Sequence, residues 1–328
     1  MKAIVYTKYG PPDVLQLKEV EKPFPKEHEI LVKVKAATVT AADIRSRSFT
    51  VPKAFWLPAR LTLGFRHPKK EILGMELAGV VERVGKNVKR FKAGDQVFAA
   101  SLQGFGAYAE YKCLPEYGPV CIKPSNITYA EAAAIPIGAR TALYFLRKAD
   151  IQKGQKVLVY GASGSVGSYA VQIARYFGAE VTGVCSTNNL EWVKSLGADK
   201  VIDYTAEDVY STDETYDVLF EAVNKSTFSD CIKLLKKGGT YINITEPLPS
   251  LRMLKTKLTS TKKIMLSRNS PETSEALNFL KELVEAGNLK VVIDRSYKFE
   301  EIAEAHRYVE KGHKKGNVVI TVDPNNKS

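Results

Sequence analysis

The sequence predicts an α/β protein with a β-rich N-terminal segment and a doubly wound parallel sheet. Alternating apolar and polar runs, separated by Gly/Pro turns, fill residues 1–125. From residue 126 onward, short apolar runs alternate with amphipathic helical patterns. Strands that alternate with helices pair in parallel, with helices on both faces of the sheet. We therefore predict a first domain at 1–125, a second at 126–268, and a C-terminal return to the first domain at 269–328.

The elements of the first segment are strands bounded by turn residues. Gly10-Pro11-Pro12 and Lys92-Ala93-Gly94-Asp95 are typical turns, because glycine and proline adopt or impose the backbone angles that turns require. The predicted strands are residues 3–6, 15–20, 29–36, 77–84, 96–99 and 104–111.

The remaining segments alternate between the two element types. Thr128 with Glu131 has the spacing of a capping box and predicts a helix that runs toward residue 146. Gly178 and Gly197 end two further helices. The predicted strands are 156–160, 180–185, 201–202, 217–220, 240–244, 263–266, 291–293 and 318–322, and the predicted helices are 166–177, 189–196, 226–235, 274–286 and 299–310.

The chain of 328 residues has a net charge of +12. Such an excess is typical of proteins that bind nucleic acid or an anionic membrane. The lysines are spread along the chain without a nucleic-acid-binding motif, which favours a solvated basic surface, part of which serves a phosphate-rich ligand. We therefore expect no nucleic-acid partner.

Other classes are excluded by short stretches of sequence. The most apolar stretch, 130–146, contains Pro136 and Arg140 and is too short for a membrane span. The four cysteines are too scattered for a disulfide framework or a metal knuckle. The N-terminal residues alternate as in a strand and lack a signal-peptide core. We expect a cytoplasmic protein.

A glycine-rich turn follows the apolar run 156–160. Gly161, Gly164 and Gly167 have the spacing GxxGxxG and open an amphipathic helix. Small residues let the backbone approach a pyrophosphate, and the helix N-terminus offers free N–H groups to it. The alternative is a tight turn without a ligand, but the strand–turn–helix context favours dinucleotide binding.

The end of the next strand distinguishes between the two nicotinamide cofactors. Sites for NAD place an acidic residue there to hold the ribose hydroxyls. Here Ser186 and Asn189 follow the strand, and the first acidic residue is Glu191. Serine and asparagine can donate hydrogen bonds to a 2′-phosphate, so NADPH is favoured, although no Arg or Lys lies in this turn.

Several phrases of the sequence resemble the medium-chain dehydrogenase/reductase superfamily over nearly the whole chain. The phrases are the glycine turn, Gly74-Met75-Glu76-Leu77-Ala78-Gly79, Gly94-Asp95-Gln96-Val97 and Leu196-Gly197-Ala198-Asp199. The resemblance implies a GroES-like catalytic domain and a Rossmann domain, with cofactor bound in the cleft between them, and a homodimer formed near residues 263–266.

The resemblance also places this chain among the zinc-free members of the superfamily. Thr40 and Met75 stand where the zinc enzymes have metal ligands, and a third cysteine and the structural zinc loop are absent. The implied branch is that of the zinc-independent quinone oxidoreductases and enone (alkenal) reductases, and no residue is expected to bind metal.

Residues at matching positions are expected to bind the cofactor. The resemblance implies a pyrophosphate site, a 2′-phosphate site, a nicotinamide side and a C-terminal loop that reaches the cofactor. In that order they are Ser163, Gly164, Ser165 and Val166; Ser186, Asn189 and Tyr204; Thr141, Val223 and Thr245; and Lys315 and Asn317.

The catalytic assignment rests on fewer matches. Thr40 replaces the asparagine of many quinone reductases, and we expect it to hydrogen-bond the substrate carbonyl. Asp43 is expected to have a structural role against basic neighbours. The insertion 49–67 contains several large apolar residues, which form either the lining of an apolar substrate pocket or a loop anchored by ordinary packing.

We thus expect an NADPH-dependent reductase of quinones or of the C=C bond of α,β-unsaturated carbonyls. Such acceptors are already electrophilic and need positioning rather than a strong Lewis acid. Two alternatives remain: a non-catalytic NADPH-binding protein that binds RNA through its basic surface, and a zinc alcohol dehydrogenase.

Overall fold

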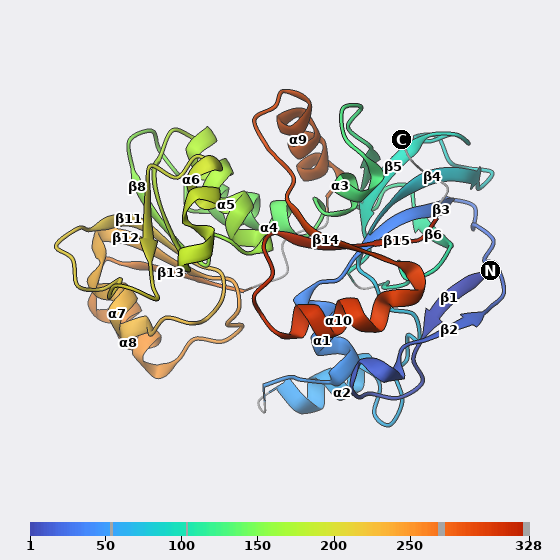
Figure 1. Ribbon diagram of the computed structural model, residues 1–328, viewed down its shortest axis with the longest axis horizontal. Helices are drawn as coiled ribbons and strands as arrows, with labels where there is room; N and C mark the ends of the chain where they lie inside the picture. The colour runs from blue at the N-terminus through green and yellow to red at the C-terminus, as the bar shows by residue number, and fades with distance from the viewer. Residues whose placement is uncertain (53–54, 103, 268–272, 324–328) are drawn as a thin grey trace. The chain divides into compact units, whose positions relative to one another are not determined.

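The computed structural model describes residues 1–52, 55–102, 104–267 and 273–323. The chain forms two compact units (Figure 1). Unit 1 comprises Met1–Ile137, Glu272–Glu285 and Val291–Ser328, and unit 2 comprises Gly138–Pro271 and Ala286–Lys290. Within the described ranges, no helix is both long and apolar enough to cross a bilayer.

Unit 1 is built on a mainly antiparallel sheet with the strand order β14-β15-β3-β4-β5-β7, and β6 pairs with β3. A separate hairpin joins β1 to β2. The strands are β1 (Lys2–Val5), β2 (Gln16–Glu19), β3 (Glu29–Thr38), β4 (Glu76–Val84), β5 (Gln96–Ala100), β6 (Tyr111–Pro115), β7 (Val120–Ile122), β14 (Ile293–Lys298) and β15 (Asn317–Thr321). The helices are α1 (Ala41–Ser48), α2 (Trp56–Leu63), α3 (Tyr129–Ala133), α9 (Ser274–Glu285) and α10 (Ile302–Glu310), with short 3₁₀ turns at Pro12–Val14 and Phe299–Glu301.

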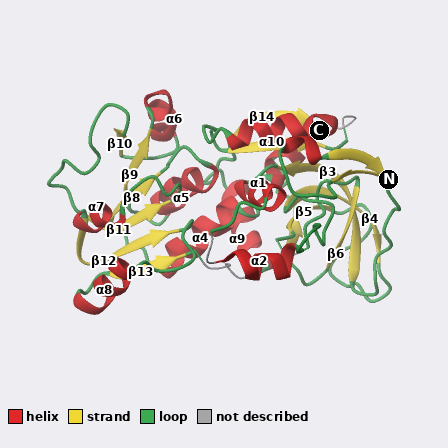
Figure 2. Ribbon diagram, turned by 90° about the horizontal axis from the view of Figure 1, so that it is seen from below, coloured by secondary structure: helices red, strands yellow, loops and turns green. Residues whose placement is uncertain are grey.

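Unit 2 is a parallel six-stranded sheet in the order β10-β9-β8-β11-β12-β13. This is the doubly wound order, in which the chain moves outward from β8 in one direction and from β11 in the other. Right-handed crossovers then place α5 and α6 on one face and α7 and α8 on the other, as Figures 1 and 2 show. The strands are β8 (Lys156–Tyr160), β9 (Glu180–Cys185), β10 (Lys200–Asp203), β11 (Tyr216–Glu221), β12 (Leu235–Asn243) and β13 (Lys263–Leu266). The helices are α4 (Gly138–Lys148), α5 (Ser165–Tyr176), α6 (Leu190–Ser195), α7 (Phe228–Lys233) and α8 (Leu251–Thr259), with a 3₁₀ turn at Thr187–Asn189.

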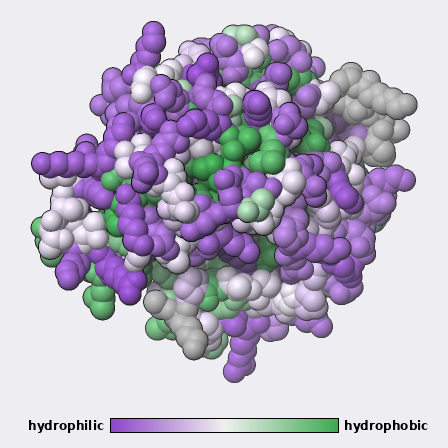
Figure 3. Space-filling model, turned by 60° about the vertical axis from the view of Figure 1, so that its left-hand side comes forward, coloured by the Kyte–Doolittle hydropathy of each residue, from purple (hydrophilic) through white to green (hydrophobic). Residues whose placement is uncertain are grey.

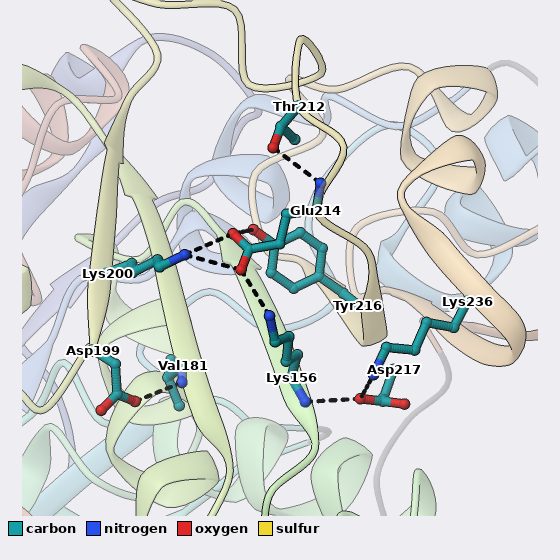
Figure 4. A network of polar contacts seen from close by, with 9 residues as sticks. All are labelled: Lys156, Val181, Asp199, Lys200, Thr212, Glu214, Tyr216, Asp217 and Lys236. Atoms are coloured by element: carbon teal, nitrogen blue, oxygen red, sulfur yellow. Dashed lines mark hydrogen bonds and ion pairs between the residues drawn. The ribbon is translucent and has the colours of Figure 1, made fainter.

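Ion pairs link the amino ends of the unit 2 strands (Figure 4). Glu214 accepts hydrogen bonds from Lys156 Nζ and Lys200 Nζ, both at 2.9 Å, and these bonds lower its pKa to about 2. Asp217 accepts from the Lys156 amide and from Lys236 Nζ, each at 2.8 Å. These contacts lie at the amino ends of the strands, whereas the glycine turn lies at the carboxyl end of β8. They therefore hold neighbouring strands together and do not cover the carboxyl ends.

The predicted α/β class is confirmed, and most predicted elements are present, but several differ in detail. The strand expected at 291–293 lies at 293–298, and the helix expected at 226–235 ends at Lys233, because Leu235 begins β12. The helix expected from Thr128 toward residue 146 is instead two helices, α3 and α4. Pro136 lies between them, and a proline has no backbone N–H to donate and disfavours a helical conformation in the residue before it. Residues 104–110 are a loop rather than a strand, since Phe105 and Gly106 have φ of 47° and 90°.

The first domain boundary also lies elsewhere than expected. The sequence prediction ended the first domain at residue 125, whereas unit 1 extends to Ile137. The reason is that α3 packs on β3, β4 and β15 of unit 1. The predicted boundary between residues 268 and 269 lies outside the described residues.

Candidate functional site

The glycine turn brings the start of α5 against the end of β8. Gly161 has a φ of 81°, and its amide and that of Ala162 donate to Val184 O at 3.1 and 3.0 Å. A Cβ on Gly167 would lie 2.1 Å from Gly161 O, so no side chain fits between the helix and the turn. Residues 163–166 are half-buried, and the first amides of α5 have no helical acceptor. This arrangement suits a pyrophosphate.

Ser186 lies at the carboxyl end of β9, beside that turn. Asn189 Nδ2 donates to Ser186 Oγ at 3.0 Å, which leaves the Ser186 hydroxyl hydrogen available to an anion. Asn189 itself is only 8 % exposed, and its Oδ1 has no hydrogen-bond partner within the described residues. Asn189 therefore orients Ser186 and does not itself reach outward. Tyr204 is 47 % exposed and stacks on Tyr160.

An acidic residue near this strand end was missed in the sequence. Asp203 ends β10, the strand next to β9. Its carboxylate accepts from Thr187 Oγ1 at 2.5 Å and from Thr205 Oγ1 at 2.6 Å, and these bonds lower its pKa. The buried carboxylate thus accepts hydrogen bonds from Thr187 and Thr205, including the Thr205 amide at 2.9 Å. In the sequence, Thr205, two residues after Asp203, could have indicated that this carboxylate accepts hydrogen bonds from nearby hydroxyl groups.

The other predicted contacts of unit 2 follow neighbouring strands. Val223 comes after β11 and packs over the glycine turn, since a Cβ on Gly161 would lie 2.6 Å from Val223 Cγ1. Thr245 comes after β12 and donates to Asn243 Oδ1 at 2.7 Å. Thr141 lies in α4, which packs against α5. The unit thus gathers these residues around the carboxyl ends of its strands, where ligands bind in doubly wound sheets.

Thr40 caps α1 in unit 1 and is bonded to Asp43. Thr40 Oγ1 donates to Asp43 Oδ2 at 2.6 Å, and the Gly74 amide donates to Asp43 Oδ1 at 3.1 Å. Burial raises the pKa of Asp43 to about 6. The expected basic neighbours of Asp43 are not its partners: hydroxyl and amide donors hold it, because the capping box turns its side chain toward the helix start.

Glu76 is a second buried carboxyl group in unit 1, which the sequence prediction missed. Glu76 accepts from Thr38 Oγ1 and from the Ile137 amide, the latter at 2.5 Å. Burial raises the pKa of Glu76 to about 7, and burial lowers the pKa of Lys314 to about 8. Only the tertiary fold shows these hydrogen bonds, since Thr38, Glu76 and Ile137 lie far apart in the sequence.

A row of polar side chains in contact with one another runs from the buried Tyr108 through His306 and Arg47 to Glu310. Tyr108 donates to Thr38 O at 3.2 Å, and its hydroxyl lies 3.3 Å from His306 Nε2. Arg47 lies 3.3 Å from His306 Nδ1 and pairs with Glu310. Burial, with the nearby Arg47 charge, lowers the pKa of His306 to about 3. The imidazole is therefore neutral at pH 7.

The two predicted cofactor residues near the C-terminus, Lys315 and Asn317, have different surroundings. Asn317 is 4 % exposed, and its Nδ2 donates to Val292 O at 3.1 Å, which favours a structural role. The Lys315 amide donates to Asp294 Oδ2 at 3.0 Å. Thr40, Lys315 and Asn317 all belong to unit 1, whereas the other candidate residues belong to unit 2.

The positions that carry zinc ligands in related enzymes have no metal-binding side chains here. Met75 is buried in the apolar core of unit 1, and Thr40 is engaged with Asp43. Among the described residues, no three His, Cys, Asp or Glu side chains gather as a metal site.

The insertion 49–67 contains the short helix α2. Arg60 lies 3.6 Å from the Phe49 ring centroid and also faces Trp56. Leu57, Leu61 and Phe65 are each more than half exposed. The insertion is thus anchored by aromatic stacking on Arg60 and also presents apolar side chains. Residues 53 and 54 lie outside the described ranges.

Comparison with known proteins identifies the family. Residues 26–125 match the alcohol dehydrogenase GroES-like domain, and residues 196–320 match the zinc-binding dehydrogenase family. The chain is 35 % identical to a 2-methylene-furan-3-one reductase of Solanum lycopersicum, over 98 % of this chain and 79 % of that protein. This chain is a member of the medium-chain dehydrogenase/reductase superfamily.

Further relatives agree with this superfamily assignment. An NADPH-dependent alkenal/one oxidoreductase of Arabidopsis thaliana is 33 % identical over 98 % of this chain and 79 % of that protein. The quinone oxidoreductase of Escherichia coli, solved with NADPH, has a TM-score of 0.82 at 26 % identity and covers 98 % of this chain and all of that one. The predicted zinc-independent quinone and alkenal reductase branch, with its GroES-like and Rossmann domains, is confirmed.

We expect Glu76→Gln to gain stability relative to the wild type as the pH rises from 5 to 8. Burial raises the Glu76 pKa from 4.5 to about 7. The folded protein then holds a proton that the unfolded chain releases. The contribution of Glu76 to stability is therefore complete below pH 4.5 and lost as the pH rises through 7. The difference should reach about 1–3 kcal/mol in urea unfolding. A difference that stays constant with pH would contradict this prediction.

Proposed function

We propose that this chain is an NADPH-dependent, zinc-independent reductase of quinones or of the C=C bond of α,β-unsaturated carbonyls. One observation supports this proposal most directly. At the carboxyl ends of the unit 2 strands, the glycine turn lies beside the Ser186 hydroxyl, whose hydrogen is available to an anion. The nearby acid Asp203 ends the neighbouring strand β10 and accepts hydrogen bonds from Thr187 and Thr205, whereas Ser186 and no acid stands at the end of β9. The names of the relatives support the same cofactor and the same acceptors.

The residues of this chain have distinct proposed roles in the reaction. When bound, NADPH supplies a hydride to the electrophilic carbon of the acceptor. The amides and small residues at 163–166 bind the pyrophosphate, and Ser186, oriented by Asn189, binds the 2′-phosphate. Tyr204 stacks beside the adenosine ribose, while Val223, Thr245 and Thr141 flank the nicotinamide side. In unit 1, the Thr40 hydroxyl turns its hydrogen from Asp43 Oδ2 to the acceptor carbonyl when substrate binds. Lys315 contacts the cofactor, and the buried Asn317 holds the neighbouring backbone through Val292 O.

Oxidation of NADPH against a panel of acceptors tests the proposed function. We expect turnover of an alkenal, an ortho-quinone or a para-quinone, and none of a simple ketone, because a ketone without conjugation needs a stronger electrophilic catalyst. The decrease in absorbance at 340 nm measures it. NADPH binding without any turnover across the panel would favour the non-catalytic alternative, and zinc-dependent turnover of a simple alcohol would favour an alcohol dehydrogenase.

Ser186→Asp tests the cofactor preference. A carboxylate at this strand end repels the 2′-phosphate and can bind ribose hydroxyls, so the Kd for NADPH should rise about tenfold or more while NADH binding improves. Fluorescence titration measures both. Ser195→Asp adds the same charge at the end of α6 and is the matched control. An unchanged NADPH affinity in Ser186→Asp would place the phosphate elsewhere.

We also propose a homodimer and a cytoplasmic location. The strand β13 (Lys263–Leu266) is the last strand of the unit 2 sheet, and among the described residues no strand pairs with its outer edge. Unpaired edges are templates for strand addition, so two copies can continue the sheet across β13. Sedimentation equilibrium should give twice the 36.3 kDa chain mass. A monomer at micromolar concentration would contradict the dimer.

A further inference from the structure

The helix α8 presents a row of leucines to solvent on the outer side of unit 2. Leu251 and Leu258 are each 86 % exposed, and Leu254 is 44 % exposed. We call these three residues the leucine stripe. Met253, on the other side of the helix, is 2 % exposed and packs into the unit 2 core. The helix is therefore anchored by one side while its apolar stripe points away from the sheet.

This stripe departs from the polar character of the protein surface. Polar residues cover most of the face drawn in Figure 3, where apolar residues gather in a few patches. Leu248, in the loop before α8, is also 53 % exposed and extends the apolar surface by one side chain. Exposed apolar surface of this kind is typical of a site that binds a partner or a membrane.

Positive charge surrounds the leucine stripe. Residues 247–266 contain five cations, Arg252, Lys255, Lys257, Lys262 and Lys263, and no Asp or Glu. Within the described residues, Lys255, Lys257 and Lys263 have no ion pair.

The elements packed beside α8 add little negative charge. Arg252 donates to Ser229 Oγ at 2.9 Å, and Lys262 Nζ donates to Ile232 O at 2.5 Å, so α7 lies alongside α8 (Figure 1). The acid on α7, Asp230, is paired with Lys233 at 2.8 Å. The region is therefore cationic as a whole.

We propose that α8 docks on the surface of an anionic phospholipid bilayer, with the leucine stripe in the interface and the lysines over the headgroups. Short amphipathic helices bind in this way when apolar burial and attraction to anionic lipid act together. A nucleic acid would leave the leucines in water. A second copy of this chain, related by a two-fold axis through the stripe, would oppose five cations to five cations.

Bilayer docking is independent of the proposed activity and compatible with the proposed dimer. α8 packs on β13 with Met253 in the unit 2 core, and the leucine stripe lies on the exposed side of the helix. A bilayer also dissolves apolar quinones and alkenals, so docking would place the enzyme near acceptors of the proposed class.

Co-sedimentation of the full chain with vesicles tests this proposal. We expect binding to vesicles of phosphatidylcholine with about one-third phosphatidylserine, and none to phosphatidylcholine alone. Raising the salt from about 0.05 to 0.5 M shortens the Debye length from about 14 to about 4 Å and should weaken binding more than about tenfold. The double variant Leu258→Ser with Lys257→Glu should lose binding by a similar factor while its oxidation of NADPH with a water-soluble acceptor is unchanged.

The matched control is Leu17→Ser with Lys18→Glu, a neighbouring exposed leucine and lysine on β2 of unit 1. It should bind anionic vesicles like the wild type. The proposal is overturned if the wild type does not bind at low salt, if both double variants bind equally, or if the α8 variant converts a dimer to a monomer, since the stripe would then be a contact between copies.

Discussion

The close approach of α5 to the turn after β8 is the constraint on which the candidate cofactor site depends. Gly161 and Gly167 leave no room for a side chain, so the helix starts directly at the carboxyl edge of the sheet. The buried side chains of α5, among them Tyr169 and Ile173, hold the helix on the strands. Its N-terminal end and the carboxyl ends of β9, β11 and β12 therefore lie close together. The position of Ser186, Val223 and Thr245 follows from this one packing contact.

The buried carboxyl groups Asp43 and Glu76 of unit 1 lie within three residues of Thr40 and Met75 in the sequence. Asp43 and Glu76 are held by hydroxyl and amide donors, and burial raises the pKa of each. Neither Thr40 nor Met75 offers the thiolate or imidazole that zinc prefers. What this part of the fold provides is a set of protonatable groups linked by hydrogen bonds, which suits an acceptor that already carries its own electrophilic carbon.

The basic residues that give the net charge of +12 have different roles in different parts of unit 2. Lys156, Lys200 and Lys236 neutralise carboxylates at the amino edge of unit 2 and stabilise the strands there. In the part of the chain that the structure describes, the cations around α8 have no carboxylate partner and surround an apolar stripe instead. The same excess of lysine therefore has a structural role in one place and forms an available surface in another.

The sequence by itself determined the α/β class, the glycine turn and the strand ends where Ser186 and Thr245 lie. These depend on local patterns: apolar periodicity, glycine spacing and the residues that follow each strand. The break between α3 and α4, the hydrogen bond from Thr38 to Glu76 and the hydrogen bond from Thr187 to Asp203 required the tertiary structure. Each joins residues whose contact depends on packing between distant segments, and burial, which raises or lowers a pKa, is a property of the folded chain.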